Sequence, residues 1–188
     1  MTDCQAMQRT GRRFRGAALA LAAVLAAACA PPAPGPSEAE EAFRKEVLAV
    51  RESLSASLAD AAAKGEPPAA GRILEQACTL ARESDRPFPC GITVLDRHGI
   101  TLASATPGAR IRRLDYSRYD VVATALKERR VVKKKLHLQD RKALYVVAIP
   151  LERRGEAVGL LVLAFDPADL MNRHGLTEAE FQRVDLGR

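Results

Sequence analysis

Behind Ser37, apolar residues recur every three or four positions, which is the spacing of one face of an α-helix. Ser37 and Glu40 have the spacing of a capping box, in which each side chain bonds the other residue's backbone amide. Gly65 and Pro67-Pro68 predict the end of this helix. The sequence therefore predicts a helix of about 26 residues with one apolar face. The stripe on that face is Phe43, Val47, Val50, Leu54 and Leu58.

A second helix is predicted before Pro87 and Pro89, and after residue 90 the pattern becomes strand-like. Two short apolar runs, 92–95 and 100–103, flank a turn in which Gly99 can supply a positive φ, so they predict a tight hairpin. A further helix of about a dozen residues is expected to start near Asp115. The second helix carries Ile73, Leu74, Ala77, Cys78 and Ala81, and the third carries Val121, Val122, Ala125 and Leu126 on its inner side.

Three more strands, at 131–138, 143–150 and 157–165, precede short helices near 168–173 and 177–183. Five strands joined mainly by hairpins predict an antiparallel sheet, and the whole pattern predicts an α+β fold. The last strand is apolar on both faces, so we expect it to be central or covered on both sides. The long first helix is expected on one face of the sheet and the middle helix on the other.

The first 28 residues have the three-part order of a secretory signal. A basic stretch precedes an apolar run at 17–28, which is shorter than the roughly 20 apolar residues that a spanning helix needs. Leu25-Ala26-Ala27-Ala28-Cys29 resembles the lipobox of bacterial lipoproteins, in which the cysteine is diacylated and becomes the mature N-terminus. The alternative is a secreted protein cut near Ala28 or Ala30. The basic residues are Arg9, Arg12, Arg13 and Arg15.

The proline-rich stretch up to Ser37 is typical of an extended spacer. We therefore divide the chain into a signal peptide (1–28), a lipidated cysteine with its linker (29–37) and a folded domain (38–188). Residues after the signal include 25 basic and 22 acidic residues, a net charge of +3, which is not the signature of a nucleic-acid partner. The expected location is the periplasmic side of a membrane, and Ala30 favours the outer membrane.

Residues 92–103, 115–119, 144–150 and 156–162 together resemble extracytoplasmic Cache sensor domains. That family has a PAS-like fold with a long N-terminal helix packed on the sheet, and the resemblance covers residues 91–166. It implies a pocket between the sheet and the loop-helix segment for a small polar ligand, such as an amino acid, another carboxylate or an amine. Most members lie between two transmembrane helices and feed an output module. This sequence has neither, so a signal would pass to a partner protein or a homodimer.

By the resemblance, the strongest candidates for pocket residues are Tyr116, Arg118 and Tyr119. An arginine guanidinium can donate two parallel hydrogen bonds to a carboxylate, and a tyrosine ring can line a pocket with its hydroxyl at the edge. Arg110 is a further candidate, with Arg112 and Arg113 beside it. The alternative is a solvated loop whose arginines contact only water. Lys133 and Tyr145 are also candidates for ligand contact. Their alternatives are an edge strand protected by Lys133-Lys134-Lys135 and a core tyrosine.

Cys78 and Cys90 predict a disulfide, because an exported chain lies in an oxidising compartment. Two buried free thiols are the alternative. His98, His137 and His174 are scattered, and no metal or cofactor motif appears. No signature of an acyl- or phosphoryl-transfer enzyme appears either, so we expect a binding protein rather than an enzyme. A second hypothesis is an envelope assembly subunit that binds a partner through the apolar stripe of the first helix.

Overall fold

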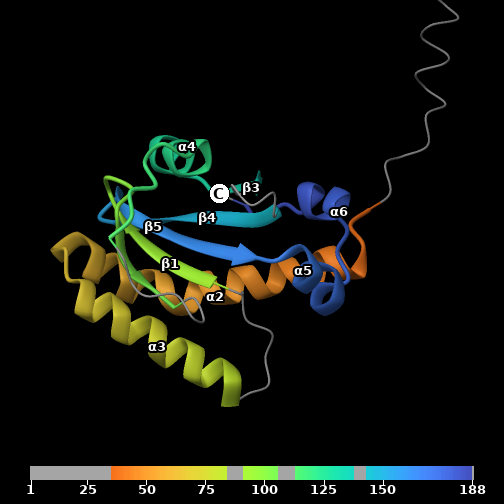
Figure 1. Ribbon diagram of the computed structural model, residues 1–188, viewed down its shortest axis with the longest axis horizontal. Coiled ribbons are helices and arrows are strands. Elements are labelled where there is room, and N and C mark those ends of the chain that lie inside the picture. Colours follow the sequence, from red (N-terminus) through yellow and green to blue (C-terminus); the bar gives the residue numbers. More distant parts are fainter. Residues whose placement is uncertain (1–34, 84–90, 106–112, 138–142, 188) are drawn as a thin grey trace, which may run out of the picture. The chain divides into compact units, whose positions relative to one another are not determined.

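The computed structural model describes residues 35–83, 91–105, 113–137 and 143–187 (Figure 1). The chain divides into two units, 1–35 and 36–188, and all the described elements belong to the second. In chain order they are α2 (Glu38–Lys64), α3 (Pro67–Glu83), β1 (Gly91–Asp96), β2 (Thr101–Ser104), α4 (Asp120–Glu128), β3 (Val132–His137), β4 (Ala143–Arg153), β5 (Glu156–Phe165), α5 (Pro167–His174) and α6 (Glu178–Arg183).

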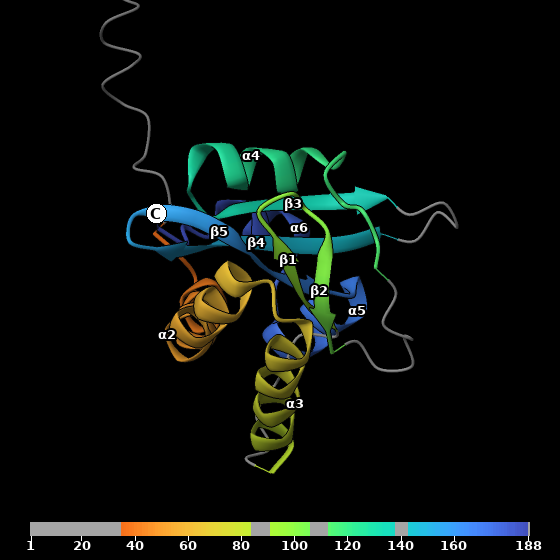
Figure 2. The ribbon, with the colours of Figure 1, turned by 90° about the vertical axis from the view of Figure 1, so that its left-hand side faces the viewer.

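The five strands form one antiparallel sheet in the order β2-β1-β5-β4-β3 (Figure 2). The strand that is apolar on both faces, β5, is the central one, as the sequence predicted. β3, which carries the three lysines, is an edge strand. Gly159 in β5 lies where a Cβ atom would come within 2.3 Å of the Leu95 carbonyl oxygen, so the sheet needs a glycine there.

The two faces of the sheet have separate hydrophobic cores. α2, with α3, α5 and α6, contributes to the larger core on one face, and α4 covers part of the other face (Figure 1). Alternate residues of β4 divide between them: Val147 and Ile149 lie in the larger core, whereas Val146 and Ala148 lie in the smaller one. The predicted placement of the long and middle helices on opposite faces is confirmed.

α2 has the predicted capping box, with Ser37 and Glu40 each bonding the other's backbone amide, and it ends at Gly65 with φ of 63°. Four residues of its stripe are buried, with Phe43 and Leu58 fully inaccessible to solvent, and Val50 is half-buried. Pro67, expected only to end the first helix, is also the first residue of α3. Proline suits a first turn because its missing amide hydrogen would have no partner there.

The start of α2 is held by the C-terminal helices. The ring of Phe43 packs edge-on against the rings of Phe165 and Phe181 at 5.2 and 5.8 Å. Glu40, which is 3% exposed, accepts hydrogen bonds from Arg183 at 2.9 Å. A buried carboxylate is tolerated when it has such partners, so α6 and the start of α2 form one packed unit.

The middle helix is shorter than the sequence predicted. It begins at Asp120 instead of near Asp115, and it has nine residues. Asp115 forms a β-bridge with Ile100, and its side chain accepts a hydrogen bond from the Ser117 amide at 2.8 Å. Residues whose backbone groups are bonded to a neighbouring turn cannot make helical hydrogen bonds, so the helix starts only after them.

Residues 1–34, which include the predicted signal peptide and Cys29, lie outside the described part of the chain. Among the helices of the described part, none combines the length and the apolar character that crossing a bilayer requires. Cys29 and the signal peptide therefore stay predictions from the sequence.

Candidate functional site

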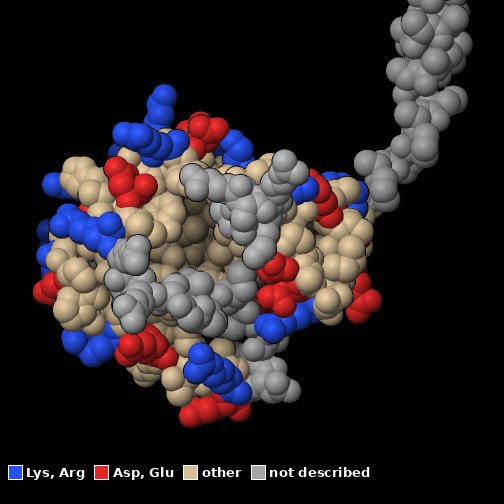
Figure 3. All heavy atoms as spheres, viewed as in Figure 1, with Lys and Arg blue, Asp and Glu red and all other residues tan. Residues whose placement is uncertain are grey.

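Within the part of the chain that the structure describes, α4 covers only part of its face of the sheet (Figure 1). Under the helix, Leu95, Val146 and Leu160 are buried against Val122 and Ala125. Beyond it, several side chains that alternation places on the same face are only half-buried. We call this set the half-covered face: Thr93, Ser104, Leu136, Leu144 and Val162. In the space-filling view the surface is hollowed near its centre, below the position of α4 (Figure 3).

Two hydroxyl groups lie side by side on the half-covered face. Thr93 is the cross-strand partner of both Ser104 and Val162. The Thr93 and Ser104 hydroxyls are 3.1 Å apart, and the Ser104 hydroxyl donates to the Ile92 carbonyl at 3.3 Å. Sequence analysis missed this pair. The sequence signal for it was Thr93, a polar residue between the apolar residues Ile92 and Val94.

The segment before α4 borders the smaller core through Tyr116, and it is held by the turn between β1 and β2. The Tyr116 amide donates to the Gly99 carbonyl, and the Thr101 amide donates to the Leu114 carbonyl, each at 2.9 Å. Gly99 has φ of 78°, and a Cβ there would lie 3.0 Å from the backbone of Ser117. The glycine predicted for the hairpin turn thus also permits the close approach of this segment.

Of Tyr116, Arg118 and Tyr119, Tyr116 is the residue that packs against the smaller core. Its ring is half-buried against the smaller core, and burial raises the pKa of its hydroxyl, with a smaller effect from Tyr119. The Tyr116 and Tyr119 rings are 5.7 Å apart between centroids. Tyr119 is 43% exposed, and Arg113 and Arg118 are exposed. Arg110 and Arg112 lie outside the described residues.

The structure does not bring Lys133 and Tyr145 together with Tyr116. Register places both on the opposite face of the sheet, over the larger core. Tyr145 is 5% exposed, and its ring packs 5.0 Å from that of Phe181. Lys135, on the same face, forms an ion pair with Glu178 at 2.6 Å. Tyr145 is thus a core residue, which is the alternative to ligand contact that its sequence position allowed.

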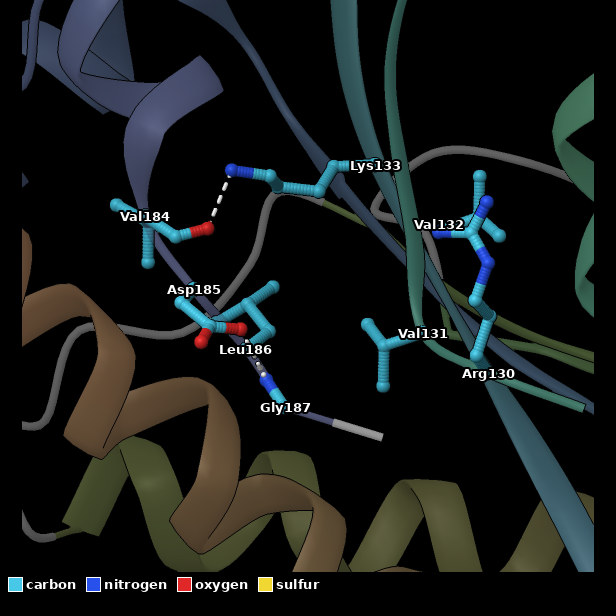
Figure 4. A pocket seen from close by; sticks show the side chains of 8 residues that line it. All are labelled: Arg130, Val131, Val132, Lys133, Val184, Asp185, Leu186 and Gly187. Atoms are coloured by element: carbon cyan, nitrogen blue, oxygen red, sulfur yellow. Dashed lines mark hydrogen bonds between the residues drawn. The ribbon is translucent and has the colours of Figure 1, made fainter.

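Lys133 instead borders a second, open groove of about 540 Å³ between β3 and the C-terminal segment (Figure 4). Its ammonium donates to the carbonyls of Phe181 and Gln182 at 2.7 and 2.8 Å and to the carbonyl of Val184. Burial lowers its pKa, an effect that Asp185 and then Glu40 partly offset. An ammonium has three hydrogens, and all three have acceptors, so Lys133 has none left for a ligand.

Charges of both signs are mixed over the face seen in Figure 3. Lys134, which points to the α4 side, pairs with Asp120 at 2.7 Å, and this bond lowers the pKa of the Asp120 carboxyl. The described residues include no group of three side chains that could hold a metal ion. Cys78 is half-buried on α3, and burial raises its pKa. Cys90 lies outside the described residues, so the disulfide stays a prediction.

No protein-family model matches the sequence, and no curated protein matches it. Solved structures do match. A domain of a sensory box/GGDEF family protein from Vibrio parahaemolyticus has a TM-score of 0.53 at 14% identity, over 75% of this chain and 60% of that chain. The extracellular domain of a protein described as a histidine kinase, vpHK1S-Z8, has a TM-score of 0.51 at 16% identity, over 75% and 57%.

The sensory domain of the Campylobacter jejuni chemoreceptor Tlp3, solved with isoleucine bound, has a TM-score of 0.48 at 15% identity, over 74% of this chain and 61% of that chain. The chain spans less than two thirds of the length of each of these three proteins. At such identities the likeness concerns the fold alone, and it rests on the two structures with TM-scores above 0.5. The chain therefore has an α+β fold, with a long N-terminal helix packed on a five-stranded antiparallel sheet, that resembles Cache sensor domains, as its sequence predicted.

Proposed function

We propose that this chain is a lipid-anchored sensor domain outside the cytoplasm, and that it binds a small polar ligand on the half-covered face. An amino acid, another carboxylate or an amine is the expected class. Binding of this kind needs an apolar floor and a few polar groups at the rim, and it needs no catalytic residue. A signal would pass to a partner protein or to a second copy of the chain.

The observation that carries the proposal is the incomplete cover that the described residues give to one face of the sheet. A nine-residue helix buries one part of that face, while Leu136, Leu144 and Val162 remain half-buried beyond it. On the other face, four helices bury the equivalent positions Val147, Leu161 and Leu163 completely. Apolar side chains left partly open around the smaller core, against which Tyr116 also packs, favour a ligand as the missing cover.

The membrane anchor in this proposal rests on the sequence around Cys29. Two acyl chains stabilise membrane attachment where one chain gives only reversible binding, since each buried methylene contributes about 0.8 kcal/mol. The test is intact-mass spectrometry of the protein isolated from its native membranes. A diacylated Cys29 at the N-terminus would support the anchor, and residues 1–28 still attached would refute it.

The alternative, a structural subunit that binds a partner through the stripe of α2, is not favoured. The stripe already packs against the sheet, with Phe43, Val47 and Leu58 at most 2% exposed. A partner could use it only if α2 left the sheet and exposed the larger core to water. The free-energy cost of such exposure, about 1.5–3 kcal/mol for each large apolar side chain, argues against it.

A thermal-shift screen of the full chain against amino acids, carboxylates and amines tests the proposal. A ligand at 100 times its dissociation constant stabilises the folded state by about 2.7 kcal/mol. For a domain of this size, we expect Tm to rise by about 5 to 10 °C. If no compound in a broad library raises Tm, the proposal fails.

Two tyrosine variants locate the binding site. Tyr116→Ala removes a ring that borders the smaller core and should weaken the ligand at least about tenfold. Tyr145→Phe changes a tyrosine on the opposite face and should leave affinity unchanged. If Tyr145→Phe weakens binding and Tyr116→Ala does not, the ligand binds elsewhere.

A further inference from the structure

We infer that Lys134 is the charged contact of the half-covered face, and that a carboxylate of the ligand binds its ammonium by displacing Asp120. This inference rests on the proposed function and names one residue that determines which ligands bind. It replaces the sequence prediction for this strand, which chose Lys133. The event is an exchange of one carboxylate for another at a single ammonium.

Lys134 is the charged member of an apolar row. Alternation along β3 puts Val132, Lys134 and Leu136 on the α4 side of the sheet, where Val132 and Leu136 pack against the smaller core. Leu136 also belongs to the half-covered face. Along this stretch of β3 and the β4 residues paired with it, Lys134 is the one charged side chain that alternation places on this side. A ligand that covers Leu136 therefore lies beside the strand position that carries this ammonium.

The present partner of Lys134 is held weakly enough to exchange. The Lys134 Nζ lies 2.7 Å from Oδ2 of Asp120, the first residue of α4. The two side chains are 46% and 78% exposed, and surface ion pairs of this kind contribute little to stability. Displacing Asp120 should therefore cost a ligand no more than about fivefold in affinity. The bond to Lys134 lowers the pKa of the Asp120 carboxyl, so this carboxylate is ionised at neutral pH and competes with the ligand.

The two neighbouring lysines are not available to the same ligand. Lys133 and Lys135 extend from the opposite face of the sheet, which carries the larger core. The Lys133 ammonium donates to three backbone carbonyls, and Lys135 pairs with Glu178 at 2.6 Å. Of these three consecutive lysines, the middle one alone lies on the side of the half-covered face.

The probes for this contact are hexanoate and norleucine, which share a carboxylate and a hydrocarbon tail that suits the apolar floor around Leu136. Each is titrated into the full chain to millimolar concentrations at neutral pH. The ionic strength is kept constant, because salt screens exposed charges. Chemical shifts of the backbone amides report binding. We expect at least one probe to bind and to shift the amides of Lys134 and Asp120.

Two variants of the ion pair should change affinity in opposite directions. Lys134→Gln removes the charged donor and should weaken the bound probe about tenfold. Asp120→Asn removes the competing carboxylate and should tighten hexanoate about two- to fivefold. Lys135→Gln and Glu178→Gln make the matched changes in the ion pair on the opposite face and should leave affinity unchanged.

The signs of these effects separate recognition from a purely structural role. If the ion pair only holds α4 in place, Lys134→Gln and Asp120→Asn should both weaken binding, and that result would overturn the inference. An affinity that Lys134→Gln leaves unchanged overturns it too. So does a lack of binding by both probes, and the proposed function then stands or fails by the thermal-shift screen, in which an amine or an uncharged ligand would still support it.

Discussion

Lys133 should be a larger source of stability than either lysine beside it. Its ammonium donates to three backbone carbonyls, two of them at 2.7 and 2.8 Å, where α6 ends. It also lies 5.6 Å from the centroid of the Phe181 ring. Lys133→Met keeps most of the apolar stem but leaves these carbonyls without their donor. The substitution therefore isolates the ammonium from the packing of the side chain.

The magnitude follows from the number of bonds and their burial. A hydrogen bond to a charged group contributes about 1.5–3 kcal/mol, but the half-buried ammonium also pays for lost hydration, and burial lowers its pKa accordingly. Water can reach some of the freed carbonyls, so the three bonds do not add in full. We expect Lys133→Met to lower the free energy of unfolding by about 2–4 kcal/mol.

Lys134→Met is the matched control. Its ammonium pairs with Asp120, whose side chain is 78% exposed, and such surface pairs contribute about 0–1 kcal/mol. Urea unfolding should therefore give a lower midpoint for Lys133→Met than for Lys134→Met, with equal m-values. Hydrogen exchange should rise most in residues 181–187. Equal midpoints for the two variants would refute the reasoning, because then the three carbonyl bonds contribute nothing net.

Four further substitutions test the fold around the site. Gly159→Ala should lower the free energy of unfolding, measured in urea, by more than about 2 kcal/mol, because its Cβ would lie 2.3 Å from the Leu95 carbonyl oxygen. Gly71→Ala has open space on α3 and should raise the free energy of unfolding by about 0.5–1 kcal/mol. Arg154→Asn should raise Tm slightly, because φ is 53° at that turn residue and asparagine tolerates it better. Hydrogen bonds from Thr177, which caps α6, lower the pKa of the Glu180 carboxyl from its usual range. The stability advantage of the wild type over Glu180→Gln should therefore be full above the pKa of the unfolded chain's glutamate and should be lost as pH falls through the folded pKa. A difference in Tm that stays constant with pH would contradict this.

The elements of this fold were predictable because their signals are local. The capping box at Ser37 and the stripe from Phe43 to Leu58 specify α2 without reference to any other part of the chain. The continuous apolar run in β5 predicted a central strand because a strand covered on both faces needs no polar side. Alternation along β3 likewise follows from the strand period alone, with Lys133 and Lys135 on one face and Lys134 on the other.

The partners of individual side chains were not predictable in the same way. Lys133 and Tyr145 have the residue types of a binding site, but both contact α6, whose own position depends on packing against Phe43. Nothing within several residues of Lys133 signals that three carbonyls about fifty positions later will accept its hydrogens. Residue type therefore proposed candidates, and long-range packing decided which of them lie together.

The extent of the half-covered face depends on a contact of the same long-range kind. Residues 115–119 have enough helical character that the sequence extends α4 through them, and a helix of that length would cover more of the sheet. The turn around Gly99 instead accepts the Tyr116 amide, and Ile100 bridges to Asp115. A backbone bonded across to this turn cannot also form helix, so the competition shortens α4. The opening on that face is thus a consequence of where the hairpin turn lies, which no local pattern in residues 115–119 records.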